Sequence, residues 1–306
     1  MRLLTRSDFD GLICAALLTE IGIVDEYKFV HPKVIQDGIL KIKANDVLAN
    51  MPYAPGCGLW FDHHASEQQR LNIDSLNFKG DSRPAPSTTQ IIWDYYGGEK
   101  RFGKHFLPLI KVTNKFDAGI LAHEDILKPK GWILIAFLLD PRTGLGRFSD
   151  YRISNNQFIE DMIQYLRTKA EEDILQVPDV KERVQRYYEQ QELFEQMLER
   201  CCEIRGKIII NNLLNEETIS SGNRFLVYVL HPDQNIEIRV MWGVKKQKVV
   251  FTCGHSILNR TSRTNVGNLM LKYGGGGHLR VGSCQVTADR WEQVLEELVE
   301  QIQKDG

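Results

Sequence analysis

Short apolar runs separated by polar residues and glycines dominate the N-terminal part of the chain. Runs of about four to eight apolar residues between turn signals are typical of buried strands, whereas apolar positions at helical spacing indicate a helix. The pattern predicts a helix over 12–21, ended by Gly22, and extended segments over 2–5, 26–31, 38–43, 46–50 and 58–61. Strands and a helix joined by short connections indicate an α/β fold with a mostly parallel sheet and helices on both faces.

The middle of the chain, from about 132 to 204, is predicted to be largely helical. Before it, Ser87 is a good N-cap for a helix over 90–96, because its side chain can accept a hydrogen bond from the first turn. A further helix is expected over 103–115.

A change from helical to β texture places a domain boundary near residue 200. Two charged segments, 154–173 and 179–204, flank Val177-Pro178, and the second has the spacing of a linker helix. Strand-like runs rich in β-branched or aromatic residues then occur at 207–210, 225–230, 236–242, 249–251 and 281–287, with helices expected over 264–272 and from 289. Three parts are therefore predicted: an α/β domain over 1–177, a linker helix over 178–204 and a smaller α/β domain over 205–306.

Composition excludes several classes of protein. The chain has 306 residues, of which 42% are hydrophobic and 25% charged, as in an ordinary water-soluble protein. No apolar run is long enough to span a membrane, and the start lacks the apolar core of a signal peptide. Six cysteines without a Cys-x-x-Cys pair indicate reduced thiols in the cytoplasm. A net charge of −2 argues against binding long nucleic acid through bulk charge.

Charge is nevertheless unevenly distributed along the chain. Positions 238–288 contain no acidic residue. The same segment contains eight basic residues: Arg239, Lys245, Lys246, Lys248, Arg260, Arg263, Lys272 and Arg280. A basic patch raises the local concentration of anions, although a solvated basic face without a ligand would have the same composition.

One carboxylate and two imidazoles, Asp62-His63-His64, stand at the end of the apolar run 58–61. These ligand types suit Mn²⁺, Mg²⁺ or Zn²⁺, and α/β sheets bind their ligands at strand ends. Asp8-Phe9-Asp10-Gly11 occupies a second strand end, where residues two apart on an extended segment share a face. Asp117, at the end of another element, is a candidate third carboxylate. Each group alone also fits a solvated turn or loop.

A run of four glycines, Gly274–Gly277, precedes His278 inside the acid-free segment. Without Cβ atoms, successive backbone N–H groups can converge on an anion, and the histidine adds a side-chain donor. The alternative is a flexible linker. The surrounding ordered α/β pattern favours an anion-binding loop.

Together these motifs resemble the DHH phosphoesterase superfamily, in the branch with a C-terminal DHHA1 domain. The resemblance covers nearly the whole chain and rests on Asp8–Gly11, Asp62–His64, Asp117 and Gly274–His278, followed by Arg280-Val281-Gly282. Members with this layout include oligoribonuclease/pAp-phosphatase enzymes and exopolyphosphatase-like proteins. The family binds two Mn²⁺ ions in its first domain, and its second domain grips a phosphate-bearing substrate across a cleft.

The resemblance implies a role for each motif residue. The implied metal ligands are Asp8, Asp10, His63 and Asp117; the implied catalytic residues are Asp62 and His64, with His64 next to the scissile phosphate; the implied substrate-binding residues are Gly275, Gly276, Gly277, His278, Arg260 and Arg280. Two Mn²⁺ ions are expected, with Mg²⁺ as an alternative. Two metal ions about 3.5–4 Å apart polarise a phosphate and lower the pKa of a bridging water.

Two positions depart from the family pattern. Many relatives carry histidine four residues before the first aspartate of the Asp-x-Asp-Gly motif, where this chain has Leu4. The strand before the Asp-His-His strand usually ends in a metal-bridging aspartate, and the nearest equivalent here is Asn50, with Asp46 as the alternative register. If both ligands are lost, one metal could be weak or absent.

The sequence therefore predicts a metal-dependent phosphohydrolase that cleaves phosphoester bonds in short oligonucleotides or small nucleotide phosphoesters such as pAp. The alternatives are exopolyphosphatase-like activity, or a nucleotide- or phosphate-binding protein with weakened catalysis. Expected partners are a small phosphate-bearing substrate or a short single-stranded nucleic acid, without a membrane. A homodimer is left open.

Overall fold

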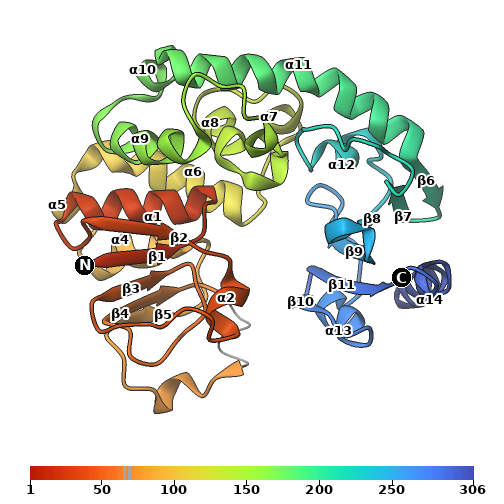
Figure 1. Ribbon diagram of the computed structural model, residues 1–306, viewed down its shortest axis with the longest axis horizontal. Coiled ribbons are helices and arrows are strands. Elements are labelled where there is room, and N and C mark those ends of the chain that lie inside the picture. Colours follow the sequence, from red (N-terminus) through yellow and green to blue (C-terminus); the bar gives the residue numbers. More distant parts are fainter. Residues whose placement is uncertain (65–66, 68–69) are drawn as a thin grey trace. The chain divides into compact units, whose positions relative to one another are not determined.

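The computed structural model describes residues 1–64, 67 and 70–306, which form two compact units (Figure 1). Unit 1 comprises Met1–Ile120 and Pro129–Tyr187, and unit 2 comprises Leu121–Lys128 and Tyr188–Gly306. Helix α11 (Pro178–Cys201) contributes residues to both units, and it begins at the proline after Val177, as the sequence predicted. It covers most of the segment predicted as a linker helix.

Unit 1 is built on a five-stranded sheet in the order β2-β1-β3-β4-β5. The strands are β1 (Arg2–Thr5), β2 (Glu26–Phe29), β3 (Asp46–Ala49), β4 (Leu59–Asp62) and β5 (Gly80–Ser82). Every neighbouring pair is parallel, which confirms the predicted sheet type. All carboxyl ends therefore meet at one edge.

Side chains alternate between the two faces of this sheet, and each face has its own helical cover. Leu4, Leu48 and Trp60 lie in register on one face and pack in a buried cluster with Ile35 of α2 (Pro32–Gln36). On the opposite face, the ring of Phe61 lies 5.1 Å from that of Tyr95 in α4. The helices predicted on both faces are present.

The remaining helices of unit 1 follow from local capping and apolar content. Asp8 caps α1 (Phe9–Glu20) and Ser87 caps α4 (Thr88–Tyr95), each by accepting a backbone N–H from its first turn. The other helices are α5 (Glu99–Phe102), α6 (Leu107–Asp117), α8 (Gly131–Leu139), α9 (Asn155–Thr168) and α10 (Glu171–Gln176), with 3₁₀ turns η1 (Ile73–Ser75), η2 (Lys104–Phe106), η3 (Pro141–Thr143) and η4 (Leu145–Arg147). Helix α8 is apolar around most of its circumference and is correspondingly buried.

Unit 2 is a six-stranded mixed sheet in the order β10-β11-β9-β8-β7-β6. Its elements are α7 (His123–Leu127), β6 (Cys202–Arg205), β7 (Ile208–Asn212), α12 (Leu226–Leu230), β8 (Ile236–Trp242), η5 (Val244–Lys246), β9 (Lys248–His255), α13 (Val266–Leu271), β10 (Gly276–His278), β11 (Val281–Thr287) and α14 (Trp291–Asp305). Only β7 and β8 pair in parallel; the other pairs among these strands are antiparallel.

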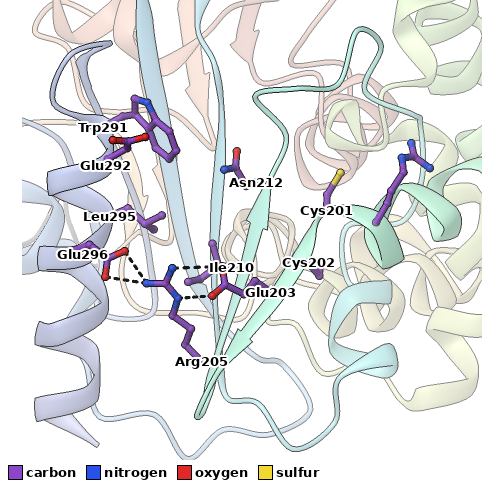
Figure 2. Close-up of a pocket in the computed structure, with 11 residues that line it drawn as sticks. Cys201, Cys202, Glu203, Arg205, Ile210, Asn212, Trp291, Glu292, Leu295 and Glu296 are labelled. Carbon is purple, nitrogen blue, oxygen red and sulfur yellow. Dashed lines mark hydrogen bonds and ion pairs between the residues drawn. The ribbon is translucent and has the colours of Figure 1, made fainter.

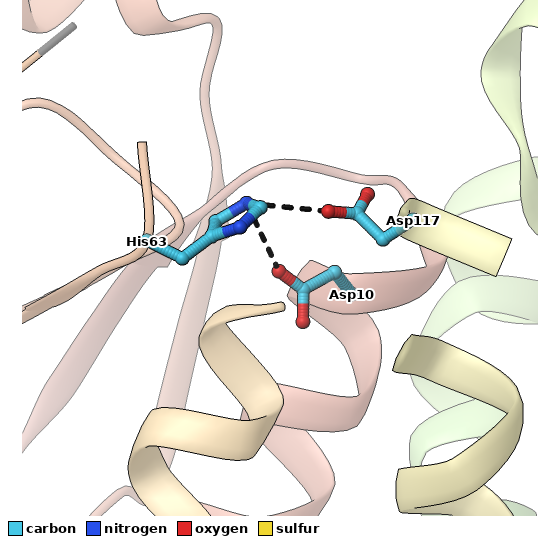
Figure 3. A group of neighbouring side chains, drawn as sticks. All are labelled: Asp10, His63 and Asp117. Carbon is cyan, nitrogen blue, oxygen red and sulfur yellow. Dashed lines mark ion pairs between the residues drawn. The ribbon is translucent and has the colours of Figure 1, made fainter. Parts of the chain in front are cut away.

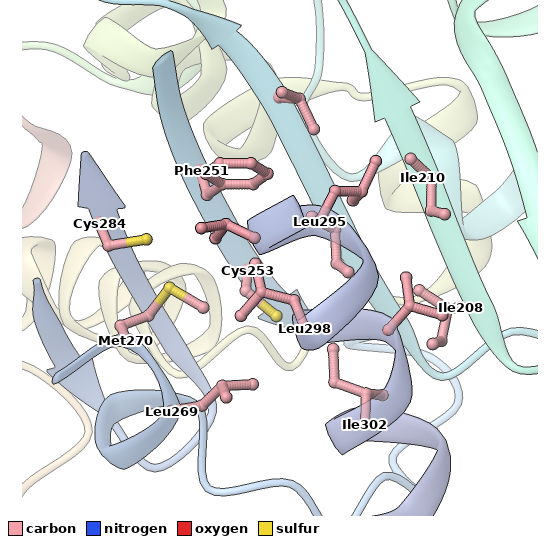
Figure 4. Close-up of a cluster of buried hydrophobic side chains, with 14 of the residues drawn as sticks. Ile208, Ile210, Phe251, Cys253, Leu269, Met270, Cys284, Leu295, Leu298 and Ile302 are labelled. Atoms are coloured by element: carbon pink, nitrogen blue, oxygen red, sulfur yellow. The ribbon is translucent and has the colours of Figure 1, made fainter. Parts of the chain in front are cut away.

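The core of unit 2 lies between one face of this sheet and helices α13 and α14 (Figure 4). Alternate residues of β8, such as Ile236 and Ile238, point into it, so Glu237 and Arg239 lie on the opposite face. There the Arg239 guanidinium lies 2.9 Å from the Glu237 carboxylate. Arg239 is therefore neutralised inside the fold and does not contribute to a surface basic patch.

Two predicted strands are wrong. Segment 38–43 is not a strand, because α2 precedes it and Gly38 turns the chain with a φ of 66°. Its alternating pattern has another cause: Leu40 and Ile42 pack against the buried cluster on the sheet face instead of joining the sheet.

The apolar run 225–230 is also not a strand, since residues 226–230 form helix α12. Asn223 forms a turn just before this helix: its carbonyl oxygen accepts the N–H of Leu226 at 2.9 Å and its side chain accepts that of Phe225 at 3.0 Å. A short continuous apolar run fits a buried strand or a buried helix equally well. The sequence reading also missed β5 and β6.

Two further observations concern the cysteine thiols and the possibility of a membrane-spanning helix. All six cysteines carry free thiols in the structure. Burial raises the pKa of the Cys14, Cys253 and Cys284 thiols, which makes them unreactive. Over the residues that the structure describes, every helix is too short or too polar to cross a membrane.

Candidate active site

The carboxyl ends of β1, β3 and β4 bring the motif residues of unit 1 together. These three strands are adjacent and parallel, so the residues that follow them gather at one edge of the sheet. Asp8 follows β1, Asn50 follows β3, and Asp62 ends β4.

Asp8 is a buried carboxylate with donors on both oxygens. Its Oδ1 accepts the Gly11 N–H at 3.1 Å and the Asn50 Nδ2 at 3.0 Å. Its Oδ2 lies 2.9 Å from Nε of Arg6. Asp8 therefore caps α1 and is neutralised by a guanidinium of the same loop.

Asp10 lies two residues on, in the first turn of α1, and is only 2% exposed. Its two carboxylate oxygens each accept a backbone N–H at 2.9 Å, from Thr88 and Thr89 at the start of α4. Gly11 is required beside it, because a Cβ there would collide with the Arg6 carbonyl oxygen. Each carboxylate oxygen can accept more than one partner, so these bonds still permit a cation to bind.

His63 joins Asp10 to Asp117 (Figure 3). Its Nε2 lies 3.2 Å from Asp117 Oδ2 and 4.0 Å from Asp10 Oδ2, and its Nδ1 faces the Ala85 carbonyl oxygen at 3.2 Å. One ligand atom from each of the three side chains lies within 4.8 Å of the others. Partial burial and the charge of Asp10 raise the pKa of Asp117 to about 6, against the opposing charge of His63.

Asp62 and His64 form a second pair. Asp62 is 1% exposed, and its Oδ1 lies 2.8 Å from His64 Nδ1, while its Oδ2 accepts the His64 backbone N–H at 3.2 Å. Burial lowers the pKa of His64, but the hydrogen bond and charge of Asp62 outweigh it and raise the pKa above its usual value. The Asp62 carboxylate thus fixes the orientation of the His64 imidazole through Nδ1 and favours the charged form of the ring.

The structure distinguishes Asn50 from Asp46 as the equivalent of the family's metal-bridging aspartate. Asn50 lies beside Asp8, whereas Asp46 lies at the opposite end of the strand, where its carboxylate bonds Nε and Nη2 of Arg2 at 2.9 Å. Leu4, at the other departure from the family pattern, is fully buried in the apolar cluster under Trp60. A hydrocarbon side chain in that cluster cannot supply a metal ligand.

Two arginines near these carboxylates were not predicted. Arg6 is bonded to Asp8, as described above. Arg142, whose side chain is 44% exposed, bonds Asp140 at 2.7 Å just after α8. Partial burial lowers the pKa of Arg142, but the charge of Asp140, with those of Asp8 and Asp117, raises it overall. The only sequence signal was Asp140-Pro141-Arg142 at the end of an apolar helix, which is too common to single out.

The predicted glycine loop of unit 2 is partly a strand. Gly276–His278 forms β10 at the edge of the sheet, paired antiparallel with β11. A Cβ on Gly275 would collide with the Ser283 carbonyl oxygen, and one on Gly277 with that of Val281. Close backbone packing is therefore a sufficient reason for glycine at these two positions. The run of glycines is weaker evidence for anion binding than the sequence suggested.

The three basic substrate-binding candidates of unit 2 lie near the same end of its sheet. His278 ends β10, and Arg280 lies in the turn to β11, where its carbonyl oxygen accepts the His255 N–H at 2.9 Å. Burial, with the charge of Arg280, lowers the pKa of His255 at the end of β9. Arg260 follows β9, and its Nε donates to the Ile257 carbonyl oxygen at 3.0 Å. Both arginine side chains are exposed.

A surface pocket of about 470 Å³ in unit 2 contains none of the predicted residues (Figure 2). It is lined by residues of β6, β7 and α14 and by the last residues of α11. Three of its charged groups pair with one another: Arg205 bonds Glu203 at 2.6 Å and Glu296 at 2.7 Å. The chemistry-bearing residues therefore lie elsewhere than in this cavity.

Carboxylates and imidazoles at the ends of parallel strands have the chemistry that a hydrolytic site for phosphoesters needs. Comparison with solved structures is consistent with this class. The chain is 42% identical to a pGpG-specific phosphodiesterase from Vibrio cholerae, with a TM-score of 0.82, over 100% of this chain and 99% of that one. The chain belongs to the DHH/DHHA1 phosphoesterase superfamily and is a phosphoesterase hydrolase.

More distant structures share the fold. An exopolyphosphatase-related protein from Bacteroides fragilis is 12% identical, with a TM-score of 0.51, over 98% of this chain and 91% of that one. RecJ from Thermus thermophilus, solved with Mn²⁺, is 11% identical, with a TM-score of 0.53, over 99% of this chain and 52% of RecJ. No protein-family model and no curated protein matches the chain.

Proposed function

We propose that this phosphoesterase hydrolyses short linear nucleotides, with the dinucleotide pGpG as its leading substrate, in a reaction that requires Mn²⁺ or Mg²⁺. The observation that carries this proposal is the 42% identity, over both full chains, to a phosphodiesterase specific for pGpG. A shared fold alone would not support a substrate, because one fold hosts many functions.

The donor set of the site fits a divalent cation. Asp10, His63 and Asp117 offer two carboxylates and an imidazole within 4.8 Å, a combination that suits Mn²⁺. Burial and the charge of Asp10 raise the pKa of Asp117, so a nearby cation would favour its ionised form. These three residues would hold the ion, which when bound neutralises phosphate charge and lowers the pKa of a water.

His64 is proposed as the general acid, positioned by Asp62. The Asp62 carboxylate holds His64 Nδ1 at 2.8 Å, so Nε2 is the ring atom assigned to the leaving oxygen. The raised pKa of His64 favours the charged imidazole, which is the form that can donate a proton to a leaving alkoxide. Arg142, fixed by Asp140, is a candidate to contact a phosphate oxygen through its exposed guanidinium.

Unit 2 is proposed to bind the phosphate-bearing end of the substrate. His278, Arg260 and Arg280 would supply the donors, together with the backbone at Gly275, Gly276 and Gly277. The exposed side chains of Arg260 and Arg280 support this role, because arginine recognises phosphate oxygens in a bidentate manner.

Hydrolysis assays on a panel of substrates test the function. The panel contains pGpG, pApA, pAp, a longer oligoribonucleotide and polyphosphate, each with Mn²⁺ and with EDTA. Release of GMP from pGpG, faster than turnover of the other substrates and abolished by EDTA, is expected. Faster hydrolysis of polyphosphate would support the exopolyphosphatase alternative, and EDTA-resistant turnover would overturn the metal requirement.

Two variants test the proposed division of roles. Asp117→Asn should lower kcat/KM at least about a thousandfold, equivalent to about 4 kcal/mol. Arg280→Ala should raise KM about tenfold with little change in kcat, because it removes binding that is equal in the ground and transition states. Lys272→Ala, an exposed lysine in the same basic segment, is the matched control.

A further inference from the structure

The two aspartates of the Asp-x-Asp-Gly motif occupy different electrostatic settings. Asp10 lies in a cluster with the His63 imidazole and the Asp117 carboxylate. Asp8 already has a full positive charge at 2.9 Å, the guanidinium of Arg6. Its other oxygen carries two N–H donors, one of them the Asn50 amide.

Asn50 is oriented to serve Asp8 as a donor. Its Nδ2 lies 3.0 Å from Asp8 Oδ1, which turns the amide oxygen away from that carboxylate. The residue is 2% exposed and has a φ of 57°, a conformation that asparagine tolerates better than most residues. Among the described residues, its amide oxygen finds no hydrogen-bond partner.

The other potential ligands beside Asp8 are lacking. Leu4 is buried hydrocarbon, and Asp46 is bonded to Arg2 at the far end of β3. Within the part of the chain that the structure describes, the only cluster suited to a metal is Asp10, His63 and Asp117. Asp8 is not part of that cluster, and a cation beside it would have to displace Arg6. Divalent ions in proteins need several oxygen or nitrogen ligands, so this position does not fit one.

We propose that the site takes one divalent cation, at Asp10, His63 and Asp117, and that Arg6 and Asn50 take the place of a second cation at Asp8. This inference rests on the proposed metal-dependent function and specifies its metal content. The Arg6 guanidinium supplies a fixed positive charge at Asp8, and its side chain is 34% exposed. A bound phosphate would then contact one exchangeable cation and the fixed guanidinium of Arg6. In a two-metal site it would contact two cations instead.

Manganese stoichiometry tests the inference independently of activity. Metal-free protein is titrated with MnCl₂ by calorimetry, and the bound ion is examined by low-temperature electron paramagnetic resonance. One Mn²⁺ per chain with the six-line spectrum of an isolated ion is expected. Two ions per chain with an exchange-coupled spectrum, as for ions about 3.5–4 Å apart, would overturn the inference but leave the proposed function intact. Absence of saturable Mn²⁺ binding would overturn both the inference and the metal requirement of the proposed function.

Variants test the assigned residues. Arg6→Ala/Asn50→Asp removes the resident charge and restores a carboxylate, so its stoichiometry should rise from one to two with a coupled spectrum. A double variant that folds, as judged by circular dichroism, and still binds one ion would contradict the roles of Arg6 and Asn50. Asn50→Asp alone, with Arg6 retained, should still bind one Mn²⁺ per chain. Arg2→Ala breaks a comparable pair, between Arg2 of β1 and Asp46 of β3 at 2.9 Å, and should also leave one bound Mn²⁺ per chain.

Discussion

Replacing Asp117 with asparagine should make the metal-free protein more stable, although it abolishes activity. Partial burial and the charge of Asp10 raise the pKa of Asp117 from 3.8 to about 6. A carboxyl group with a higher pKa in the folded chain binds more protons when folded. Its contribution to stability is therefore present below about pH 4 and is lost as the pH rises to about 6. Above that range the ionised side chain opposes folding.

The size of the effect follows from the same shift. A change from 3.8 to about 6 corresponds to at most about 3 kcal/mol, at about 1.36 kcal/mol per pKa unit. The side chain is 26% exposed, so solvent screening reduces the expected gain to about 1 kcal/mol. For a domain of this size, that gain raises Tm by about 2–4 °C.

Calorimetric unfolding of the wild type and Asp117→Asn, with EDTA, measures the difference at pH 4 and pH 8. The variant should melt higher at pH 8 and equally at pH 4. Adding Mn²⁺ should reverse the order at pH 8, because the ion stabilises only the chain that binds it. Asp94→Asn, which removes an exposed carboxylate 2.7 Å from Arg83, is the control and should not raise Tm. A lower Tm for metal-free Asp117→Asn at pH 8 would refute the reasoning.

Three further changes give distinct outcomes. Asp10→Ala should destabilise metal-free protein by about 2–4 kcal/mol in urea unfolding, because it leaves the buried N–H groups of Thr88 and Thr89 without their acceptor; an unchanged midpoint would contradict this. Gly277→Ala should lower the free energy of unfolding by about 1–3 kcal/mol, because the new Cβ would collide with the Val281 carbonyl oxygen. Gly276→Ala should lower it by less than about 0.5 kcal/mol, because its Cβ would meet no described atom within 4 Å. Equal thermal shifts for the two variants would be the contrary result. Glu237→Gln should lower the free energy of unfolding in urea by about 2–3 kcal/mol, because Arg239 loses its charged partner. This cost is smaller than that of breaking a fully buried ion pair. A gain in stability would argue against the prediction.

The sequence predicted the sheet of unit 1 because local signals and tertiary role agree there. Asp8 and Ser87 are strong N-caps, and the apolar runs at β1, β3 and β4 are too short and too apolar for surface helices. The runs at 38–43 and 225–230 were wrong for a physical reason. Their side chains are buried against a sheet face or among helices, which demands apolar residues without demanding a strand.

The candidate site was predictable only for residues within short motifs. Asp8, Asp10, Asp62, His63 and Asp117 could be named from their spacing at element ends, and the structure gathers them at one sheet edge. Arg142 depends on the path of the chain after α8, which no local pattern encodes. The orientation of the Asn50 amide likewise depends on a contact 42 residues away, with Asp8.

Asn50 and Arg6 stabilise the same buried carboxylate, that of Asp8. If position 50 carried a carboxylate, two negative charges about 4 Å apart would face each other in the metal-free site. Such a pair repels by about 4 kcal/mol at an effective dielectric constant of about 20. An amide at position 50 turns this repulsion into a hydrogen bond at 3.0 Å, and Arg6 neutralises the remaining charge at 2.9 Å. Asn50 and Arg6 together thus keep the buried Asp8 carboxylate stable without a second ion.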